Sequence, residues 1–457
     1  HLKYFVAHEK TFLYSGVEYA FEDDDKSNGS NIYVVGFHGG RSRIVIPDAI
    51  EGHKVIAIAD SAFAGNKSLT SIGFKSEIPV GASAFENCVN LREVEFDKIT
   101  SIGAGAFKNC VKLESVVINN NISLVPKDAF NGCAALTTVT VTDGETDIEI
   151  GSRAFANCKS LKNVEFLRNI DYSYNRGQRD WFTGSTVQRL RINNYELNPY
   201  GINAISLMFG KSGANTLSDV VLKELVIDNL DRIPVEFCAN LPLTAFEVKN
   251  INSTEINSRA FLNCKYLSKF AFPKAITAVY DSAFYNTAIT AFNGSALTAI
   301  RNDAFGRCAD LKTFTTAGNT LLQEVGERAF AGCESLVSFT VPSGVTEFSL
   351  LMFENCTSLA EIKYARGTSI GKIHNGAFYG CTALEKFDLP DGGLTTIGDQ
   401  AFANCSALQR FDVTEAVAYI GDFAFSGCKS FTSFTVPDSV YSFGNGALRG
   451  CDSLTEL

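Results

Sequence analysis

Hydrophobic and polar residues follow one pattern that repeats along most of this chain. The pattern is clearest in residues 102–118, which read I-G-A-G-A-F-K-N-C-V-K-L-E-S-V-V-I. The second half of the unit, L-x-x-V-x-F in its commonest form, alternates at its end and predicts a short strand with Val and Phe pointing inward. The first half, I-G-x-x-A-F-x-N-C, predicts a return segment that is irregular or ends in a short helical turn. The same frame returns in residues 150–166, 256–272, 325–341, 397–413 and 420–436.

The motif Phe recurs about every 23 residues, a period that predicts stacked repeats. One unit buries its Leu, Val and Phe on one side only, so its neighbours must complete the core. We therefore predict that residues 41–457 form an α/β-type solenoid. It would be a curved array of about seventeen rungs, in which short parallel strands are joined by helical or irregular return segments. Residues 168–217 lose the Ala and Cys of the motif and predict irregular, insert-bearing repeats.

The two ends of the array differ from its middle. Residues 1–40 lack the repeat, but Val17–Phe21 and Ile32–Phe37 have the composition of strands. The acidic, Asn-Gly-containing connection between them favours a β-hairpin, which we expect to cap the apolar face of the first rung. The chain stops at Leu457, inside a predicted strand, so we expect a truncated chain or an end completed by a contact.

The 13 cysteines belong to the repeat rather than to a disulfide framework. All except Cys238 lie three residues after the motif Phe, or after Leu448, which replaces it. Stacked strands lie about 4.8 Å apart, which keeps side chains of one column farther apart than the roughly 3.8 Å between the Cβ atoms of a disulfide. We therefore predict free, buried thiols. The chain has no C-x-x-C motif or Cys/His cluster, so we expect neither a metal site nor a cofactor.

Composition and charge narrow the classes of partner. The hydrophobic content of 46% and charged content of 20% are those of an ordinary folded protein. The net charge of -10 argues against nucleic acid as a partner, because phosphate binding requires a basic surface. No apolar run is long enough to span a membrane, so we predict no membrane insertion within this chain. The chain begins at His1, and a signal or anchor removed before this point would not be visible.

Residues suited to catalysis are scarce. Four of the five histidines lie in or next to the predicted cap, and His374 lies on a return segment. Neither a G-x-S-x-G nucleophile motif nor an H-E-x-x-H zinc motif occurs. We predict that the protein is not an enzyme.

The predicted strands offer one candidate binding surface. Residues two, four and six positions after the repeat Leu point outward onto the concave face of the sheet. Extended faces of this kind are binding surfaces in solenoids, although any exposed sheet must also be polar. The outward residues at the early end of this face include Glu93, Glu95, Asp97, Thr138 and Thr140.

The irregular middle offers a second candidate, because it combines aromatic and arginine residues. Such residues dominate binding hot spots, and loops on a rigid scaffold commonly carry recognition. The alternative is that the rings fill gaps left by the lost motif residues. The predicted ligand-binding residues are Tyr172, Tyr174, Arg176, Arg179, Trp181, Arg189, Arg191 and Tyr195.

The repeated pattern A-F-x-(N/G)-C-x-x-L, with I-G before it and L-x-x-V-x-F after it, resembles the leucine-rich repeats of BspA type, which also occur in Treponema surface proteins. The resemblance covers roughly residues 41–457. It implies an extracellular or cell-surface protein of a host-associated bacterium, often concerned with adhesion or binding.

We accordingly predict a non-catalytic binding or adhesion protein that recognises a host or matrix protein, or a glycan. Either the concave face or the central aromatic and arginine loops would make the contact. The alternative is a passive spacer that presents another module, and a weaker one is an enzyme whose site lies in the irregular middle.

Overall fold

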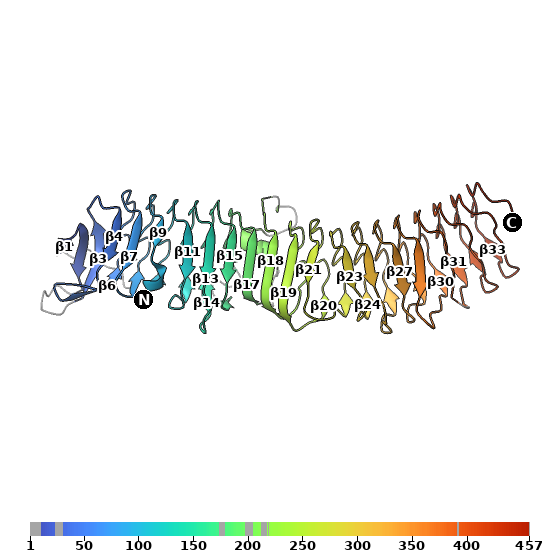
Figure 1. The fold of residues 1–457 in the computed structure, drawn as a ribbon, viewed down its shortest axis with the longest axis horizontal. Coiled ribbons are helices and arrows are strands. Elements are labelled where there is room, and N and C mark those ends of the chain that lie inside the picture. The colour runs from blue at the N-terminus through green and yellow to red at the C-terminus, as the bar shows by residue number, and fades with distance from the viewer. Residues whose placement is uncertain are drawn as a thin grey trace. The chain divides into compact units, whose positions relative to one another are not determined.

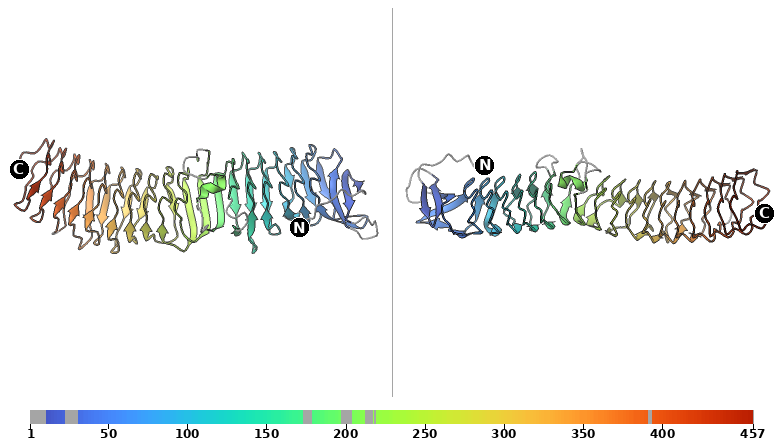
Figure 2. Two further views of the ribbon diagram at one scale, coloured as in Figure 1. Left: turned by 180° about the vertical axis from the view of Figure 1, so that it is seen from behind. Right: turned by 90° about the horizontal axis from the view of Figure 1, so that it is seen from above.

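A computed structural model describes residues 11–22, 31–172, 179–196, 204–211, 217, 219–390 and 393–456. The chain divides into two compact units, His1–Leu230 and Asp231–Leu457, which are described here one at a time. Within each unit, successive rungs are short parallel strands (Figure 1), joined by turns that Figure 2 shows from behind and from above. The predicted parallel-strand solenoid is confirmed.

The first unit begins with antiparallel strands. β1 (Thr11–Tyr14) pairs with β2 (Val17–Phe21), and β2 pairs with β3 (Ile32–Phe37). β3 then pairs in parallel with β6 (His53–Ile58), which carries the sheet into the repeats. The antiparallel pairing of the two expected strands is therefore present, whereas their role as a cap stays a prediction.

The repeats of the first unit place strands in two rows. One row begins with a three-stranded sheet and, after the 3₁₀ helix η1 (Phe96–Lys98), continues in a longer sheet. Its strands are β4 (Arg43–Ile46), β7 (Ser71–Phe74), β9 (Glu93–Val94), β11 (Ser115–Ile118), β13 (Thr138–Val141), β15 (Asn163–Phe166), β17 (Arg189–Tyr195) and β18 (Glu224–Leu230). The other row is made of β6, β8 (Ile78–Val80), β10 (Ile99–Ile102), β12 (Leu124–Val125), β14 (Ile148–Ile150) and β16 (Ile170–Asp171), with β5 (Ala49–Ile50) antiparallel to β6. A second 3₁₀ helix, η3 (Ile205–Phe209), follows β17.

The second unit repeats this arrangement with shorter strands. In the first row β19 (Ala245–Ile251) pairs with β21 (Lys269–Ala271), and two further sheets of two strands each follow: β23 (Ala291–Asn293) with β25 (Thr313–Thr315), and β27 (Ser338–Val341) with β29 (Glu361–Tyr364). The second row consists of β20 (Glu255–Ile256), β22 (Ala278–Val279), β24 (Ala299–Ile300), β26 (Glu324–Val325), β28 (Glu347–Phe348), β30 (Lys372–Ile373), β31 (Thr396–Ile397), β32 (Tyr419–Ile420) and β33 (Ser442–Phe443).

In most described repeats the return segment is a series of turns, and a helical turn is found in the segment that ends at Phe209, which is η3. The residue two positions after the motif Phe has a left-handed backbone, as at Asn87 (φ 61°) and Asn109 (φ 60°). Asn and Gly tolerate this conformation better than other residues, which explains why they precede the motif Cys. The glycine four positions before Phe serves another purpose. A Cβ on Gly103 would overlap the backbone of Ala82 in the preceding turn, so close packing of neighbouring rungs requires glycine there.

The core of each unit is a column of motif Phe rings. In the first unit Phe85 and Phe107 stack at 5.2 Å and 5°, and in the second unit Phe402 and Phe425 stack at 5.3 Å and 1°. Each of these rings is fully buried between the rings of the neighbouring rungs, so each rung depends on both of its neighbours for its core. This mutual dependence is the reason that the motif Phe hardly varies.

The prediction of free, buried thiols is confirmed. All the cysteines are free, and all are buried except Cys451, which is half-buried. A typical thiol donates a hydrogen bond to the carbonyl of the preceding motif Phe, as Cys110 Sγ does to Phe85 at 3.1 Å. Burial raises the pKa of these thiols, to about 12 for Cys88 and for Cys158. Protonated thiols away from solvent are poor nucleophiles, so the column is a packing element.

Cys238, which lies outside the cysteine frame, occupies the place of a motif Phe. Its N–H donates to the Ala260 carbonyl, as the N–H of Phe261 does to Ala283, and Cys264 Sγ donates to the Cys238 carbonyl at 3.0 Å. Phe237, the candidate motif Phe of this rung by spacing, is therefore one position out of frame. The large buried side chain of this rung is therefore supplied by Phe237, one position before Cys238.

Candidate binding surface on the parallel sheet

The sheet face of the first unit has the predicted alternation of side chains. In β13 and β15 the inward residues Val139 and Val164 are buried and lie side by side. The outward residues Thr138 and Thr140 are partly exposed, as expected. Sequence periodicity therefore assigns the exposed face correctly wherever the strand is regular.

The three acidic residues expected on this face are all exposed, but only one of them lies in a strand. Glu93 is in β9, beside Ser71 of β7. Asp97 lies in η1, and Glu95 precedes it. The Glu95 carboxylate accepts a hydrogen bond from the Phe74 N–H at 3.2 Å. The missing side chain of Gly73 makes room for this contact. The regular face is interrupted here because a 3₁₀ turn replaces the end of the strand.

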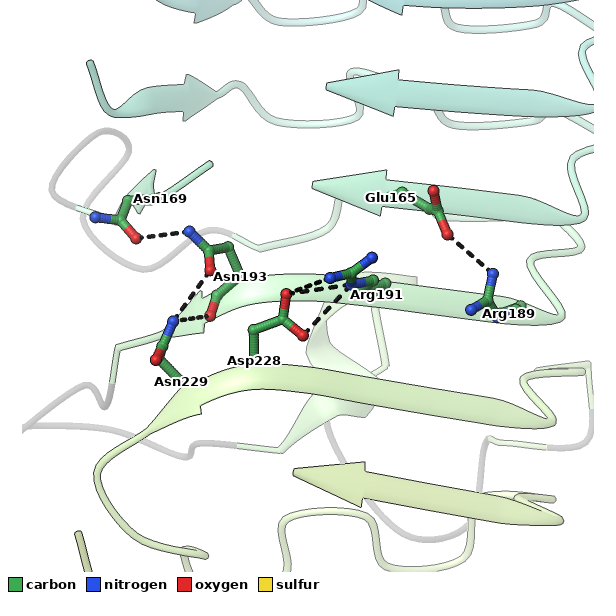
Figure 3. A network of polar contacts seen from close by, with 7 residues as sticks. All are labelled: Glu165, Asn169, Arg189, Arg191, Asn193, Asp228 and Asn229. Carbon is green, nitrogen blue, oxygen red and sulfur yellow. Dashed lines mark hydrogen bonds and ion pairs between the residues drawn. The ribbon is translucent and has the colours of Figure 1, made fainter. Parts of the chain in front are cut away.

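The richest polar arrangement on this face lies on β15, β17 and β18 (Figure 3). Arg189 in β17 donates to the Glu165 carboxylate of β15 at 2.9 Å and lies 3.5 Å from the Glu224 carboxylate of β18. Arg189 thus bridges the strands on both sides. Its side chain is 42% exposed, so part of it is accessible to a partner.

Arg191, two residues further along β17, forms a more sheltered ion pair with Asp228 of β18 (Figure 3). Its Nη2 and Nε donate to Asp228 Oδ2 at 2.8 and 3.2 Å. A guanidinium that donates two hydrogen bonds to one carboxylate is held in a defined orientation. The Arg191 and Asp228 side chains are 28% and 14% exposed, so the pair is less accessible than Arg189.

A row of asparagine amides continues the network along the same face. Asn193 in β17 donates to the Asn169 side chain at 3.1 Å, and Asn229 in β18 donates to Asn193 at 3.0 Å. We define the polar face as Glu165, Asn169, Arg189, Arg191, Asn193, Asp228 and Asn229. Only its two arginines were predicted as site residues. The alternation R-L-R-I-N in β17 also contains the signal for Asn193, whereas no sequence spacing identifies Asp228 as the partner of Arg191.

The other described residues of the predicted aromatic and arginine site lie inside the protein. Tyr172, Arg179, Trp181 and Tyr195 are 8%, 6%, 2% and 3% exposed. The Arg179 guanidinium lies over the Tyr172 ring at 4.5 Å and the Tyr195 ring at 5.1 Å, and the Tyr172 and Trp181 rings are 6.0 Å apart. The rings therefore pack against one another in the place where the repeat motif is lost. The remaining two predicted residues, Tyr174 and Arg176, lie outside the described residues.

Buried Arg168, in the same region, was not predicted as a site residue. Its guanidinium donates to the carbonyl groups of Asn119, Asn120 and Ile122 and to the Thr146 hydroxyl. Burial lowers its pKa. Arg168 thus links its own rung to the backbone of residues 119–122 and to the Thr146 side chain, a structural role that no short-range sequence signal reveals.

Searches of the described residues for a metal-binding group and for a membrane-spanning helix found neither. No group of three His, Cys, Asp or Glu side chains among them could hold a metal ion. In the described part of the chain, no helix has the length and apolar character needed to cross a membrane. His374 lies 3.1 Å from the Glu347 carboxylate and forms an exposed contact between neighbouring rungs. What the polar face offers is a fixed set of charged and amide groups for noncovalent contact.

Comparison with known proteins identifies the repeat. The profile of the BspA type leucine rich repeat region matches in six copies over residues 56–185, 145–198, 231–360 and 352–457. No protein of curated function matches the sequence.

Several solved structures align with this chain at low sequence identity. A leucine rich cell surface protein of Faecalibacterium prausnitzii is 20% identical, with a TM-score of 0.35, and the match covers 98% of this chain and 94% of that one. A leucine-rich repeat protein of Bacteroides ovatus is 21% identical, with a TM-score of 0.34, over 97% and 93% of the two chains. The leucine rich repeat protein of T. pallidum is 20% identical, with a TM-score of 0.25, over 38% of this chain and 98% of that one.

Proposed function

Because this chain belongs to the BspA-type leucine-rich repeat family, we propose that it is a non-catalytic, cell-surface or secreted protein that binds a partner protein through its polar face. Proteins of this repeat class are commonly used in binding and adhesion. The observation that carries the proposal is the concentration of charged and amide groups on three adjacent strands and on Asn169, just before β16. Groups held on a rigid sheet lose little conformational freedom on binding.

The chemistry of the face favours a partner with charges of both signs. Two arginines lie among the carboxylates of Glu165, Glu224 and Asp228, with amides beside them. Such a mixed pattern recognises a complementary pattern of charges, which gives specificity rather than bulk affinity. Fully protonated, buried thiols are also compatible with an oxidising extracellular environment, because they react slowly.

The test is a swap of the ion pair on the polar face. In the double variant Arg191→Asp with Asp228→Arg, the two charges exchange places but can still pair, so the fold should be retained. Wild-type and variant chains would be compared on arrays of matrix proteins, cell-surface proteins and glycans. We expect a protein bound by the wild type to bind the variant at least about tenfold more weakly, since charged groups at a binding surface are worth about 1.4 kcal/mol or more.

The matched control is Arg92→Glu, a change to an exposed arginine of the same unit that is paired with Glu114 but lies outside the polar face. It should leave binding unchanged. A spacer would bind nothing on any array. Equal binding of the swap variant would place recognition elsewhere, and a bound glycan without a bound protein would refute the proposed class of partner.

A further inference from the structure

A groove opens in the second unit, on the strand side of residues 245–293. β21 pairs with β19, and β23 pairs with β25. β21 and β23 follow one another in this row but belong to separate sheets (Figure 1). The facing edges of both strands therefore carry backbone groups outside any sheet ladder, which is the arrangement that accepts an added strand.

The interruption is confined to the strand side of these rungs. Beneath it, the motif rings of Phe261 and Phe284 stack at 5.4 Å, and β20, β22 and β24 remain paired. The Phe284 ring contacts both Phe270 of β21 and Phe292 of β23, at 5.0 and 5.6 Å. The groove thus opens above a continuous core, which gives it a firm base.

The groove is partly apolar because three of its outward strand residues are alanines. Ala245, Ala271 and Ala291 occupy outward strand positions, where the next rung carries Thr313 and Thr315. Two half-buried rings, Phe270 and Phe272, stack at 6.1 Å in the lining. The volume is about 850 Å³, within the range of sites that enclose a ligand.

The charged residues of the lining are Glu247, Lys269 and Lys274. All three are exposed. Lys274 Nζ donates a long hydrogen bond to the Asn252 carbonyl at 3.5 Å, and none of the three charged groups forms an ion pair with another described residue. Their sum is positive in a chain whose net charge is -10. This local reversal favours a ligand with a carboxylate.

We propose that this groove binds an extended peptide segment of a partner protein by strand addition, with an apolar side chain over Ala271 and an acidic side chain beside Lys269 and Lys274. An extended segment provides backbone N–H and C=O groups for the free strand edges, and its alternate side chains enter the groove. The bulky side chain fills the space above the alanines, and the carboxylate meets the lysines. This site lies in a different unit from the polar face and does not depend on it.

The experiment selects linear peptides from a random displayed library on the full-length chain and measures synthetic copies by fluorescence anisotropy. We expect enriched peptides to contain an aromatic or large aliphatic residue next to Asp or Glu. Ala271→Glu should weaken their binding at least about tenfold, because it fills and charges the groove. Lys269→Glu should weaken it about three- to tenfold.

Two matched variants control for a general effect of acidic substitution. Thr315→Glu changes the outward position equivalent to Ala271 two rungs along, and Lys386→Glu changes the position equivalent to Lys269; both should bind as the wild type. The circular dichroism spectrum and melting temperature should not change in any of the four variants, since all four side chains are solvent-facing. Absence of enriched peptides, equal binding to the Ala271→Glu chain, or loss of peptide binding in the Arg191→Asp, Asp228→Arg chain would each overturn the proposal. Failure of the polar face in its own assay would leave this result unaffected.

Discussion

Some residues in this protein have structural roles that cannot be predicted from the residues next to them in the sequence. Arg168 is the clearest case. Its long, charged side chain is 1% exposed and donates most of its hydrogen bonds to backbone carbonyl groups. Burying an arginine is favourable only when most of its donors are satisfied. Its removal would take the guanidinium donor away from the carbonyl groups of Asn119, Asn120 and Ile122, of which Ile122 is buried.

We therefore expect Arg168→Met to lower the free energy of unfolding of the first unit by about 2–4 kcal/mol. Methionine retains the apolar bulk but none of the hydrogen bonds. The fluorescence of Trp181, the single tryptophan and a buried residue of this unit, reports unfolding in urea. Arg92→Met is the control and should change stability by less than about 0.5 kcal/mol, because the ion pair it breaks is exposed. A change of similar size in both variants would contradict the structural role of Arg168.

At the scale of the element, the buried thiols form a column in which Ser or Thr can take the place of Cys. Ser185 occupies a cysteine position, and its hydroxyl donates to the Phe155 carbonyl at 2.7 Å, as a thiol does elsewhere. Thr287 takes the same place in another rung and contacts Cys308 Sγ at 3.3 Å. The position requires a small donor rather than sulfur chemistry.

The column makes the fold sensitive to alkaline pH. Burial raises the pKa of the thiols above the ordinary value of 9.0, to about 12 for Cys88 and Cys158, and well above it for Cys110 and Cys133. The unfolded chain therefore loses protons first. The stabilising effect is complete below about pH 9 and is lost as the pH rises from there toward the folded-state pKa, by about 1.4 kcal/mol per pH unit for each thiol.

We expect Cys133→Ser to reduce this alkaline loss of stability in the first unit by about 1.4 kcal/mol per pH unit, because serine keeps the donor and does not ionise. At pH 7 its stability should lie within about 1 kcal/mol of the wild type. Urea titrations at pH 7, 9 and 10, followed by Trp181 fluorescence, measure both effects. An unchanged pH dependence would show that ionisation of the thiols is not what weakens the fold at high pH.

At the scale of the whole molecule, stability is a sum of contacts between neighbouring rungs. Phe rings, thiols and backbone hydrogen bonds all link one rung to the next, so no central core unites distant parts of the chain. A perturbation should therefore remain close to its origin. A long array of this kind need not unfold in a single all-or-none transition.

The same Arg168→Met change tests this locality. Hydrogen exchange measured on peptides along the chain should accelerate about tenfold or more around Asn119–Ile122 and stay within about twofold of the wild type in residues 300–456. A uniform acceleration over both units would instead indicate one cooperative structure. Arg92→Met again provides the control and should leave exchange unchanged throughout.

The repeat, the parallel solenoid, the outward and inward strand positions and the unpaired thiols could all be inferred from the sequence. These features depend on interactions within a rung or between adjacent rungs. The same sequence signal for them occurs in many near-identical rungs. Tertiary structure alone decided that Trp181 and Tyr172 are buried, that Cys238 replaces a motif Phe, that turns form most of the return segments and η3 one of them, and that β21 and β23 do not pair. It also decided which carboxylate meets Arg191, because the two residues lie 37 positions apart. Each of these outcomes depends on how one irregular rung packs on the next, and a pattern defined by regular rungs carries no information about that contact.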